Sequence, residues 1–202
     1  MMIRLLAGLL IVGSSASASL GVEDPSVWRQ AQEILQPASA AVDLRVRFLR
    51  GGSFFNVDDA GLGIHVSGQP GTNGSVRFSG RAGSGLAFEA LPLSSSRPVY
   101  GYQFRSASLS GRVVRFGRGL LIDGQAGGRP FALTLERTSM PDSWEIVGRD
   151  GTRLKAWITP SYAGITGAFL PEKMSREGLS VLGAAIALMF SEEGGLLEQA
   201  HL

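Results

Sequence analysis

A run of twelve residues near the end of the chain, Leu179 to Phe190, is apolar apart from Ser180. A helix that is apolar on all sides has to be buried in protein or in lipid, because none of its faces can meet water favourably. The Ala and Leu content favours a helix, which at about 1.5 Å per residue extends about 18 Å. Since the hydrocarbon core of a bilayer is about 30 Å thick, we predict a buried core helix over residues 173–191, with a membrane segment as the alternative.

A different pattern begins after residue 41. Between Val42 and Phe48, apolar residues at every second position alternate with Asp43, Arg45 and Arg47. This alternation is typical of a strand that buries one face and exposes the other. We therefore predict that the β-rich part of the chain starts here.

Short apolar runs recur as far as Phe169 at a spacing of roughly ten residues, separated by Gly, Pro, Asn or Asp. The dipeptides Asp123-Gly124 and Asp150-Gly151 are typical of hairpin turns, because Gly adopts positive φ without a steric cost. Residues 51–85 are the least regular and are expected to contain long loops. Ten to twelve strands at about this spacing favour an antiparallel barrel or sandwich. We predict an all-β fold, a closed or nearly closed antiparallel barrel around a hydrophobic C-terminal helix, because closure removes exposed sheet edges.

The first 18 residues have the form of a secretory signal peptide. Arg4 supplies a positive charge, Leu5 to Val12 is an unbroken apolar run, and Ala16 and Ala18 fit the small-x-small rule for cleavage before Ser19. An uncleaved anchor is the alternative, but an eight-residue run is far short of the roughly 20 residues that span a bilayer. We expect an exported protein of the periplasm or the extracellular space, with no transmembrane segment in the mature chain.

Removing 18 of the 202 residues leaves 184, enough for one domain with a substantial core. Residues 19–40 are predicted to form an N-terminal segment with a short helix, which Asp24 can cap and for which Pro25 suits the first position. The barrel domain is assigned to residues 41–193, including the C-terminal helix, and residues 194–202 form a tail. Because the chain has no cysteine, it has no disulfide framework.

The layout of about twelve short strands followed by one apolar helix resembles the tubby C-terminal, phospholipid scramblase and LURP-one-related group. The matching portion runs from Phe131 to Phe190. It includes the strand and Asp-Gly turn from Trp144 to Gly151, the run Leu154 to Ile158, and the final helix. The resemblance implies a twelve-stranded barrel closed around a central hydrophobic helix. Its familiar members face the cytosol, unlike an exported chain, and we assign no counterpart of the basic phosphoinositide-binding residues of tubby.

The sequence shows no catalytic set. His65 is the one internal histidine, and no Gly-x-Ser-x-Gly elbow is present, so a Ser-His-Asp arrangement has no support. Two distant histidines without cysteine do not form a usual zinc site. We interpret His65 as an exposed strand residue and predict no catalytic residue, metal or cofactor. Paired carboxylates from distant strands remain an alternative, although Glu89, Glu136 and Glu145 are expected to be solvated.

Four arginines lie close together in the sequence and are the candidate ligand-binding residues. If neighbouring strands bring them together, they form an anion-binding patch; the alternative is a solvated polar face with Asp123 or Glu136 as partners. A formal charge of +2 does not indicate a nucleic-acid-binding protein. The four candidates are Arg112, Arg115, Arg118 and Arg129.

These observations predict a non-enzymatic binding or structural module of the cell envelope, whose partner is an anionic lipid or another envelope protein. One alternative is a lipocalin-like carrier of a small apolar ligand, which requires an empty barrel interior. A second is a hydrolase that uses paired carboxylates.

Overall fold

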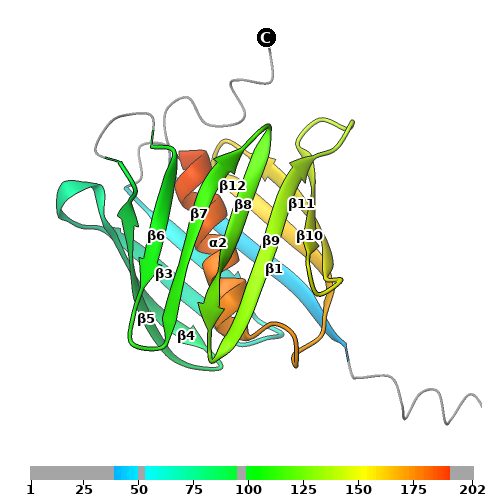
Figure 1. The fold of residues 1–202 in the computed structure, drawn as a ribbon, viewed down its shortest axis with the longest axis horizontal. Coiled ribbons are helices and arrows are strands. Elements are labelled where there is room, and N and C mark those ends of the chain that lie inside the picture. The colour runs from blue at the N-terminus through cyan, green and yellow to red at the C-terminus, as the bar shows by residue number, and fades with distance from the viewer. Residues whose placement is uncertain (1–38, 50–52, 95–98, 192–202) are drawn as a thin grey trace, which may run out of the picture. The chain divides into compact units, whose positions relative to one another are not determined.

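The computed structural model describes residues 39–49, 53–94 and 99–191. The predicted signal peptide with its cleavage between Ala18 and Ser19, the N-terminal segment up to residue 38, and the tail from residue 194 lie outside the described residues. Within the described ranges the chain forms twelve strands, a short 3-10 helix and one long α-helix (Figure 1). The elements are β1 (Ala40–Phe48), β2 (Phe55–Asp59), β3 (Ile64–Pro70), η1 (Thr72–Gly74), β4 (Val76–Ala82), β5 (Ser84–Pro92), β6 (Gly101–Arg105), β7 (Leu109–Phe116), β8 (Gly119–Ala126), β9 (Arg129–Arg137), β10 (Ser143–Gly148), β11 (Arg153–Thr159), β12 (Tyr162–Phe169) and α2 (Arg176–Ser191).

The strands form a closed antiparallel barrel in which each strand pairs with its neighbours in the sequence. The first and last strands close the ring: β1 pairs with β12 from Ala40 opposite Phe169 to Arg47 opposite Tyr162. The predicted all-β antiparallel barrel is therefore confirmed. Its pairing leaves no described strand with a free edge, which is the arrangement that protects a sheet against pairing with other chains.

Alternation of side chains explains how each strand contributes to both surfaces of the barrel. In β1 the side chains of Val42, Leu44, Val46 and Phe48 are buried, and the residues between them are exposed. Successive side chains of a strand point to opposite faces, so the apolar set faces the interior and the charged set faces outward. The period of two in the sequence predicted this strand correctly.

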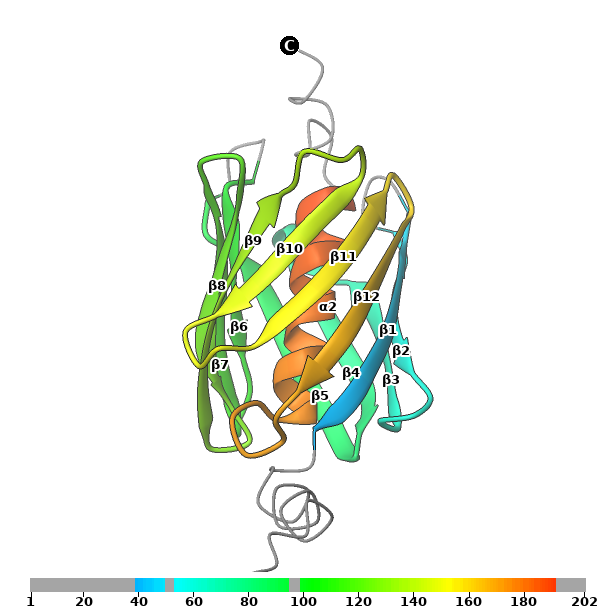
Figure 2. The ribbon, with the colours of Figure 1, turned by 90° about the vertical axis from the view of Figure 1, so that its right-hand side faces the viewer.

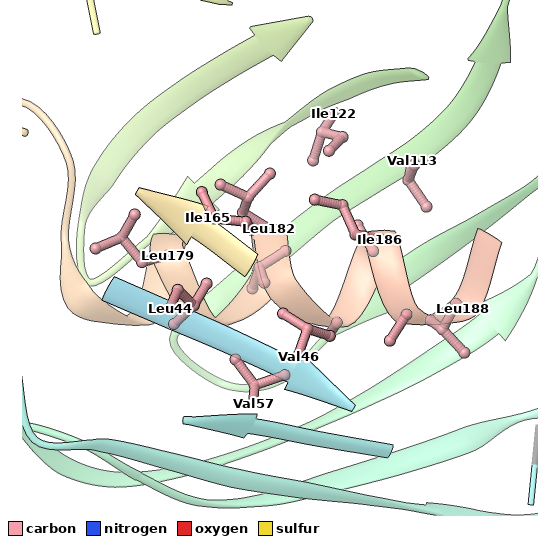
Figure 3. Packing of buried hydrophobic residues seen from close by; sticks show 14 of the residues in the cluster. Leu44, Val46, Val57, Val113, Ile122, Ile165, Leu179, Leu182, Ile186 and Leu188 are labelled. Atoms are coloured by element: carbon pink, nitrogen blue, oxygen red, sulfur yellow. The ribbon is translucent and has the colours of Figure 1, made fainter. Parts of the chain in front are cut away.

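Helix α2 runs through the interior of the barrel (Figure 2). Every residue from Gly178 to Ser191 is buried, and the helix contacts strands from around the ring, including β1, β2, β8 and β6. Figure 3 shows Leu44 and Val57 on one side of the helix and Ile122 on another. The predicted buried core helix is confirmed, and no helix in the described ranges has the length and apolar character needed to cross a membrane.

The helix is fixed at both ends. At its start, the Ser175 hydroxyl accepts a hydrogen bond from Gly178 N and donates one to Ala126 O, both at 3.1 Å. Near its end, the ring of Phe190 meets Trp144 edge to face, with ring centroids 5.3 Å apart. The helix thus begins at Arg176, after the Ser175 cap, rather than at residue 173 as predicted.

Two local predictions were wrong, and one was right. Asp123-Gly124 lies inside β8 and not in a turn. A Cβ on Gly124 would be 2.3 Å from Ser110 O, so the glycine permits close approach of β7. The irregular stretch 51–85 contains regular strands, of which β2 was not predicted. Asp150-Gly151 does form the turn between β10 and β11, where Gly151 has a φ of 88° and Asp150 accepts a hydrogen bond from Thr152 N.

Candidate functional site

The two ends of the barrel differ in their exposed side chains. Large exposed hydrophobic residues gather at the end of the barrel where α2 terminates, which is the upper end in Figure 1. They lie at or next to the first and last residues of the strands there. Their relative exposures lie between 43% and 65%. Among the described residues, one further large hydrophobic side chain is exposed, Trp157 on the outer wall of β11. We call the six residues at this end the apolar rim: Leu49, Phe54, Leu93, Tyr100, Phe116 and Met140.

Backbone hydrogen bonds hold the apolar rim in place. Leu49 N donates to Phe54 O at 3.1 Å, which joins β1 to β2. Leu93 N donates to Gly101 O at 2.9 Å, and Arg115 N donates to Tyr100 O at 3.0 Å. The exposed side chains therefore project from strand ends that belong to the barrel ladder. Binding residues positioned by a rigid scaffold in this way lose little freedom when they meet a partner.

The apolar rim also has basic residues beside it. Arg118 occupies the turn after Phe116, and Arg137 is the last residue of β9. Among the described residues that connect strands at this end, Asp142 is the one acid. The rim therefore combines large apolar side chains with a small excess of positive charge.

The opposite end of the barrel is closed by the segment that leads into α2. The Lys173 ammonium donates to Asp150 O at 2.8 Å, and Ser175 joins the start of the helix to β8. A hollow of about 400 Å³ at this end is lined by apolar residues such as Leu62 and Met174 and by the charged residues Arg129, Arg176 and Glu177. None of the exposed large hydrophobic residues in the described ranges belongs to this end.

The four predicted arginines do not form one patch. On the outer wall, Arg112 Nε lies 3.1 Å and 3.2 Å from the two carboxylate oxygens of Asp123, as the solvated alternative expected. Arg115 belongs to the inward-facing set of β7, with its Nε and Nη2 atoms buried. Arg118 lies at the apolar rim, whereas Arg129 begins β9 at the opposite end. The structure thus places Arg115 and Arg118 at one end and separates them from the other two.

The histidine and the carboxylates that the sequence offers for catalysis lie on the outer wall. His65 is an exposed strand residue, as interpreted, and its Nδ1 is hydrogen-bonded to the Asp58 carboxylate. Glu89 faces Arg77 at 3.7 Å, and Glu145 accepts a hydrogen bond from Arg153 at 3.1 Å. Across the described ranges, no group of three or more His, Cys, Asp or Glu side chains is arranged to hold a metal ion.

The apolar rim was not predicted from the sequence, although the sequence contains a signal for it. Leu49 directly follows Phe48 and therefore leaves the inward-facing phase of β1. Phe116 likewise differs in phase from Val113, which is fully buried. Large apolar residues that fall out of phase beside a turn are the sequence signature of such a rim.

The fold and its ends define a class of protein: a closed twelve-stranded antiparallel barrel filled by its own C-terminal helix. Comparison of the chain with models of protein families, with curated proteins and with solved structures finds no match.

Proposed function

We propose that this protein is a non-catalytic binding module of the cell envelope that attaches to an anionic membrane surface through the apolar rim. The observation that carries the proposal is the gathering of six large exposed hydrophobic residues at one end of the barrel. Exposed hydrophobic residues without a binding role are usually scattered singly over a surface. A group of them at one place typically marks an interaction site.

The arrangement of the rim suits a membrane. Its residues project from several strand pairs around the ring, so a flat surface can touch them together. Phe54, Tyr100 and Phe116 are aromatic, and aromatic side chains favour the boundary between headgroups and acyl chains. Arg118 and Arg137 can contact lipid phosphates, and each basic residue near an anionic surface contributes about 1 kcal/mol.

The barrel interior supports a binding role over a carrier role. A lipocalin-like carrier needs an empty interior, whereas α2 occupies this one and is buried along its length. The carboxylates of Glu89 and Glu145 are engaged by arginines on the outer wall, which gives the paired-carboxylate hydrolase little support. The rigid, filled barrel is suited to presenting its rim.

We further propose that the chain is related to the tubby C-terminal, scramblase and LURP-one-related group. The twelve strands closed around a C-terminal helix support this relation. An export signal in residues 1–18 would place this module in the periplasm or outside the cell. There its partner would be the outer leaflet of a cytoplasmic membrane or another anionic envelope surface.

Vesicle flotation tests the proposal. The protein is mixed with vesicles of phosphatidylcholine alone or of phosphatidylcholine with added phosphatidylglycerol. We expect it to float with the anionic vesicles. Replacing both Phe116 and Met140 with Ser should lower the affinity by at least about tenfold, since each half-exposed side chain contributes on the order of 1 kcal/mol on burial.

The Trp157→Ser variant is the control, because it removes a large exposed hydrophobic residue from the outer face of β11 rather than from the rim. It should bind as the natural protein does. The natural protein and its variants have the same N-terminal segment, so any difference in their vesicle binding comes from the barrel. Absent binding to both vesicle types, or equal binding by the rim variant, would overturn the proposal.

A further inference from the structure

A second candidate site lies on the outer wall, on strands whose exposed faces do not contribute to the apolar rim. Strands β11, β12, β1 and β2 are neighbours in the barrel, and Figure 2 shows them side by side. Their register places Trp157 opposite Gly164, Gly164 opposite Arg45, and Arg45 opposite Asp58. These positions point outward, because the residues between them on each strand are buried. One row across four strands therefore joins an aromatic ring, a gap without a side chain, a guanidinium and a carboxylate.

The gap at Gly164 is covered by Tyr162. The Tyr162 hydroxyl oxygen lies 3.3 Å from the place where a Cβ of Gly164 would be. The Tyr162 ring also meets Trp157 at a centroid distance of 6.3 Å and an interplanar angle of 65°. Tyr162 thus shields the glycine backbone, whereas Trp157 packs against Tyr162 and remains 54% exposed. An indole held against a second ring and open to water is an unusual use of a large apolar side chain.

Beside the two rings, the wall has a hollow that charged residues line in part. A hollow of about 460 Å³ on β1 and β2 is lined by Asp43, Arg45, Arg47 and Asp58, and its volume is in the range of small-molecule sites. Arg45 donates a hydrogen bond to the Asp43 carboxylate at 3.0 Å, and this bond, together with the negative charge of Asp43, raises the pKa of Arg45. Arg47 faces Tyr162 across the pairing of β1 and β12. The rings and the hollow therefore adjoin.

The floor of the hollow is held by a buried carboxylate. Asp59 is 3% exposed, and its two oxygens accept hydrogen bonds from Asp43 N at 2.8 Å and from Leu62 N at 3.0 Å. On the far side, Asn56 and His65 both hydrogen-bond to Asp58. The polar groups that line the hollow are thus positioned by neighbouring residues.

We propose that this wall site, comprising Trp157, Tyr162, Arg45, Arg47, Asp43 and Asp58, binds the ring of a neutral sugar. The exposed indole offers an apolar face to the C–H groups of a sugar ring, because the negative face of an aromatic ring attracts their partial positive charge. Guanidinium groups donate hydrogen bonds and carboxylates accept them, so together they can engage neighbouring hydroxyls of one ring.

The charges favour a neutral ligand. The two guanidinium groups of the wall site balance the two carboxylates, and the buried carboxylate of Asp59 is already satisfied by the amides of Asp43 and Leu62. A compact anion would be repelled by the carboxylates, and an apolar ligand would leave the charged groups without water. A hydroxyl-rich, uncharged ring satisfies donors, acceptors and the aromatic face together. This site is independent of the membrane surface proposed above.

The indole N–H signals in a proton–nitrogen correlation spectrum provide the test. The chain contains three tryptophans, and the Trp157→Phe variant identifies the signal of Trp157 by its loss. The probes are cellotriose, maltotriose and the N-acetylglucosamine trimer, with trigalacturonic acid as the charged comparison. We expect a saturable shift of the Trp157 signal with at least one neutral probe, at a Kd on the order of 1 mM for a shallow, exposed site. The signal of buried Trp144 should not move.

Two variants and one control complete the experiment. Trp157→Ala and Arg45→Met should each weaken binding of the neutral probe by at least about tenfold, as measured by calorimetry. The Phe116→Ser variant at the apolar rim should bind the sugar normally while losing affinity for vesicles. No shift with any neutral probe, unchanged affinity in the Trp157→Ala variant, or tighter binding of trigalacturonic acid would overturn the proposal. None of these results would alter the outcome of the flotation experiment.

Discussion

Gly183, in the middle of α2, packs directly against Val57 of β2. A Cβ on Gly183 would lie 2.6 Å from Val57 Cγ1 and 3.2 Å from Leu44 Cδ2. The helix therefore approaches this part of the wall so closely that a side chain has no room there. A glycine in a helix costs roughly 1 kcal/mol relative to alanine, and here the close approach explains its presence.

Replacing Gly183 with Ala should accordingly destabilise the barrel despite the better helix propensity. Overpacking a core costs about 1–3 kcal/mol, which we expect to exceed the propensity gain and to lower the free energy of unfolding. Gly178→Ala is the matched control, because the nearest atom to its added Cβ is Cγ of the flexible Met174 side chain at 3.3 Å. Urea unfolding of the two variants gives the comparison. A Gly183→Ala protein at least as stable as the Gly178→Ala protein would contradict the close packing of Gly183 on Val57.

The start of α2 depends on Ser175. Its hydroxyl caps Gly178 N and also bonds to Ala126 O of β8, so it anchors the helix to the barrel. Ser175→Ala removes both bonds, and we expect the free energy of unfolding to fall by about 1 kcal/mol or somewhat more. Ser175→Thr keeps the hydroxyl and should retain most of the stability. Equal stability of the Ala variant and the natural protein in thermal unfolding would show that the cap is dispensable.

Asp59 has a structural role that its neighbour Asp58 lacks. Asp59 is buried and accepts hydrogen bonds from two backbone amides, whereas the Asp58 side chain remains 32% exposed in its pair with His65. Asp59→Ala leaves both amides without this acceptor, which costs about 1–3 kcal/mol for each buried group. Asp58→Ala should change stability by about 0.5 kcal/mol or less, because polar contacts at exposed side chains contribute little. Denaturant unfolding of the two variants decides between these roles, and similar losses would contradict the assignment.

Much of the fold could be predicted from residue patterns. The twelve apolar residues from Leu179 to Phe190 required burial, and alternation within short runs indicated strands with one buried face. These signals are local and depend only on the period of each element. The closed barrel around α2 follows from combining them, since a fully apolar helix and many half-buried strands can satisfy each other.

The candidate sites could not be predicted in the same way, because they depend on register and on the positions of turns. Arg112 and Arg115 are three residues apart and so point to opposite faces of β7. Asp123-Gly124 was predicted to be a turn, but β8 continues through it to Ala126, so Arg129 lies at the other end of this strand from Arg118. The row from Trp157 to Asp58 spans strands that are more than 90 positions apart in sequence, and no local pattern indicates it.

The placement of Arg118 and Arg129 at opposite ends of the barrel gives a sharp electrostatic test. If the apolar rim meets an anionic membrane, Arg118→Gln should weaken binding to phosphatidylglycerol vesicles by roughly fivefold, the equivalent of about 1 kcal/mol for one basic residue at the surface. Arg129→Gln removes the same charge from the chain but lies at the far end, so its affinity should equal that of the natural protein. Because salt screens exposed charges, the difference between the two variants should shrink as sodium chloride is raised in the flotation assay. Equal weakening by both variants would indicate an effect of net charge alone, and the rim would not be the attachment surface.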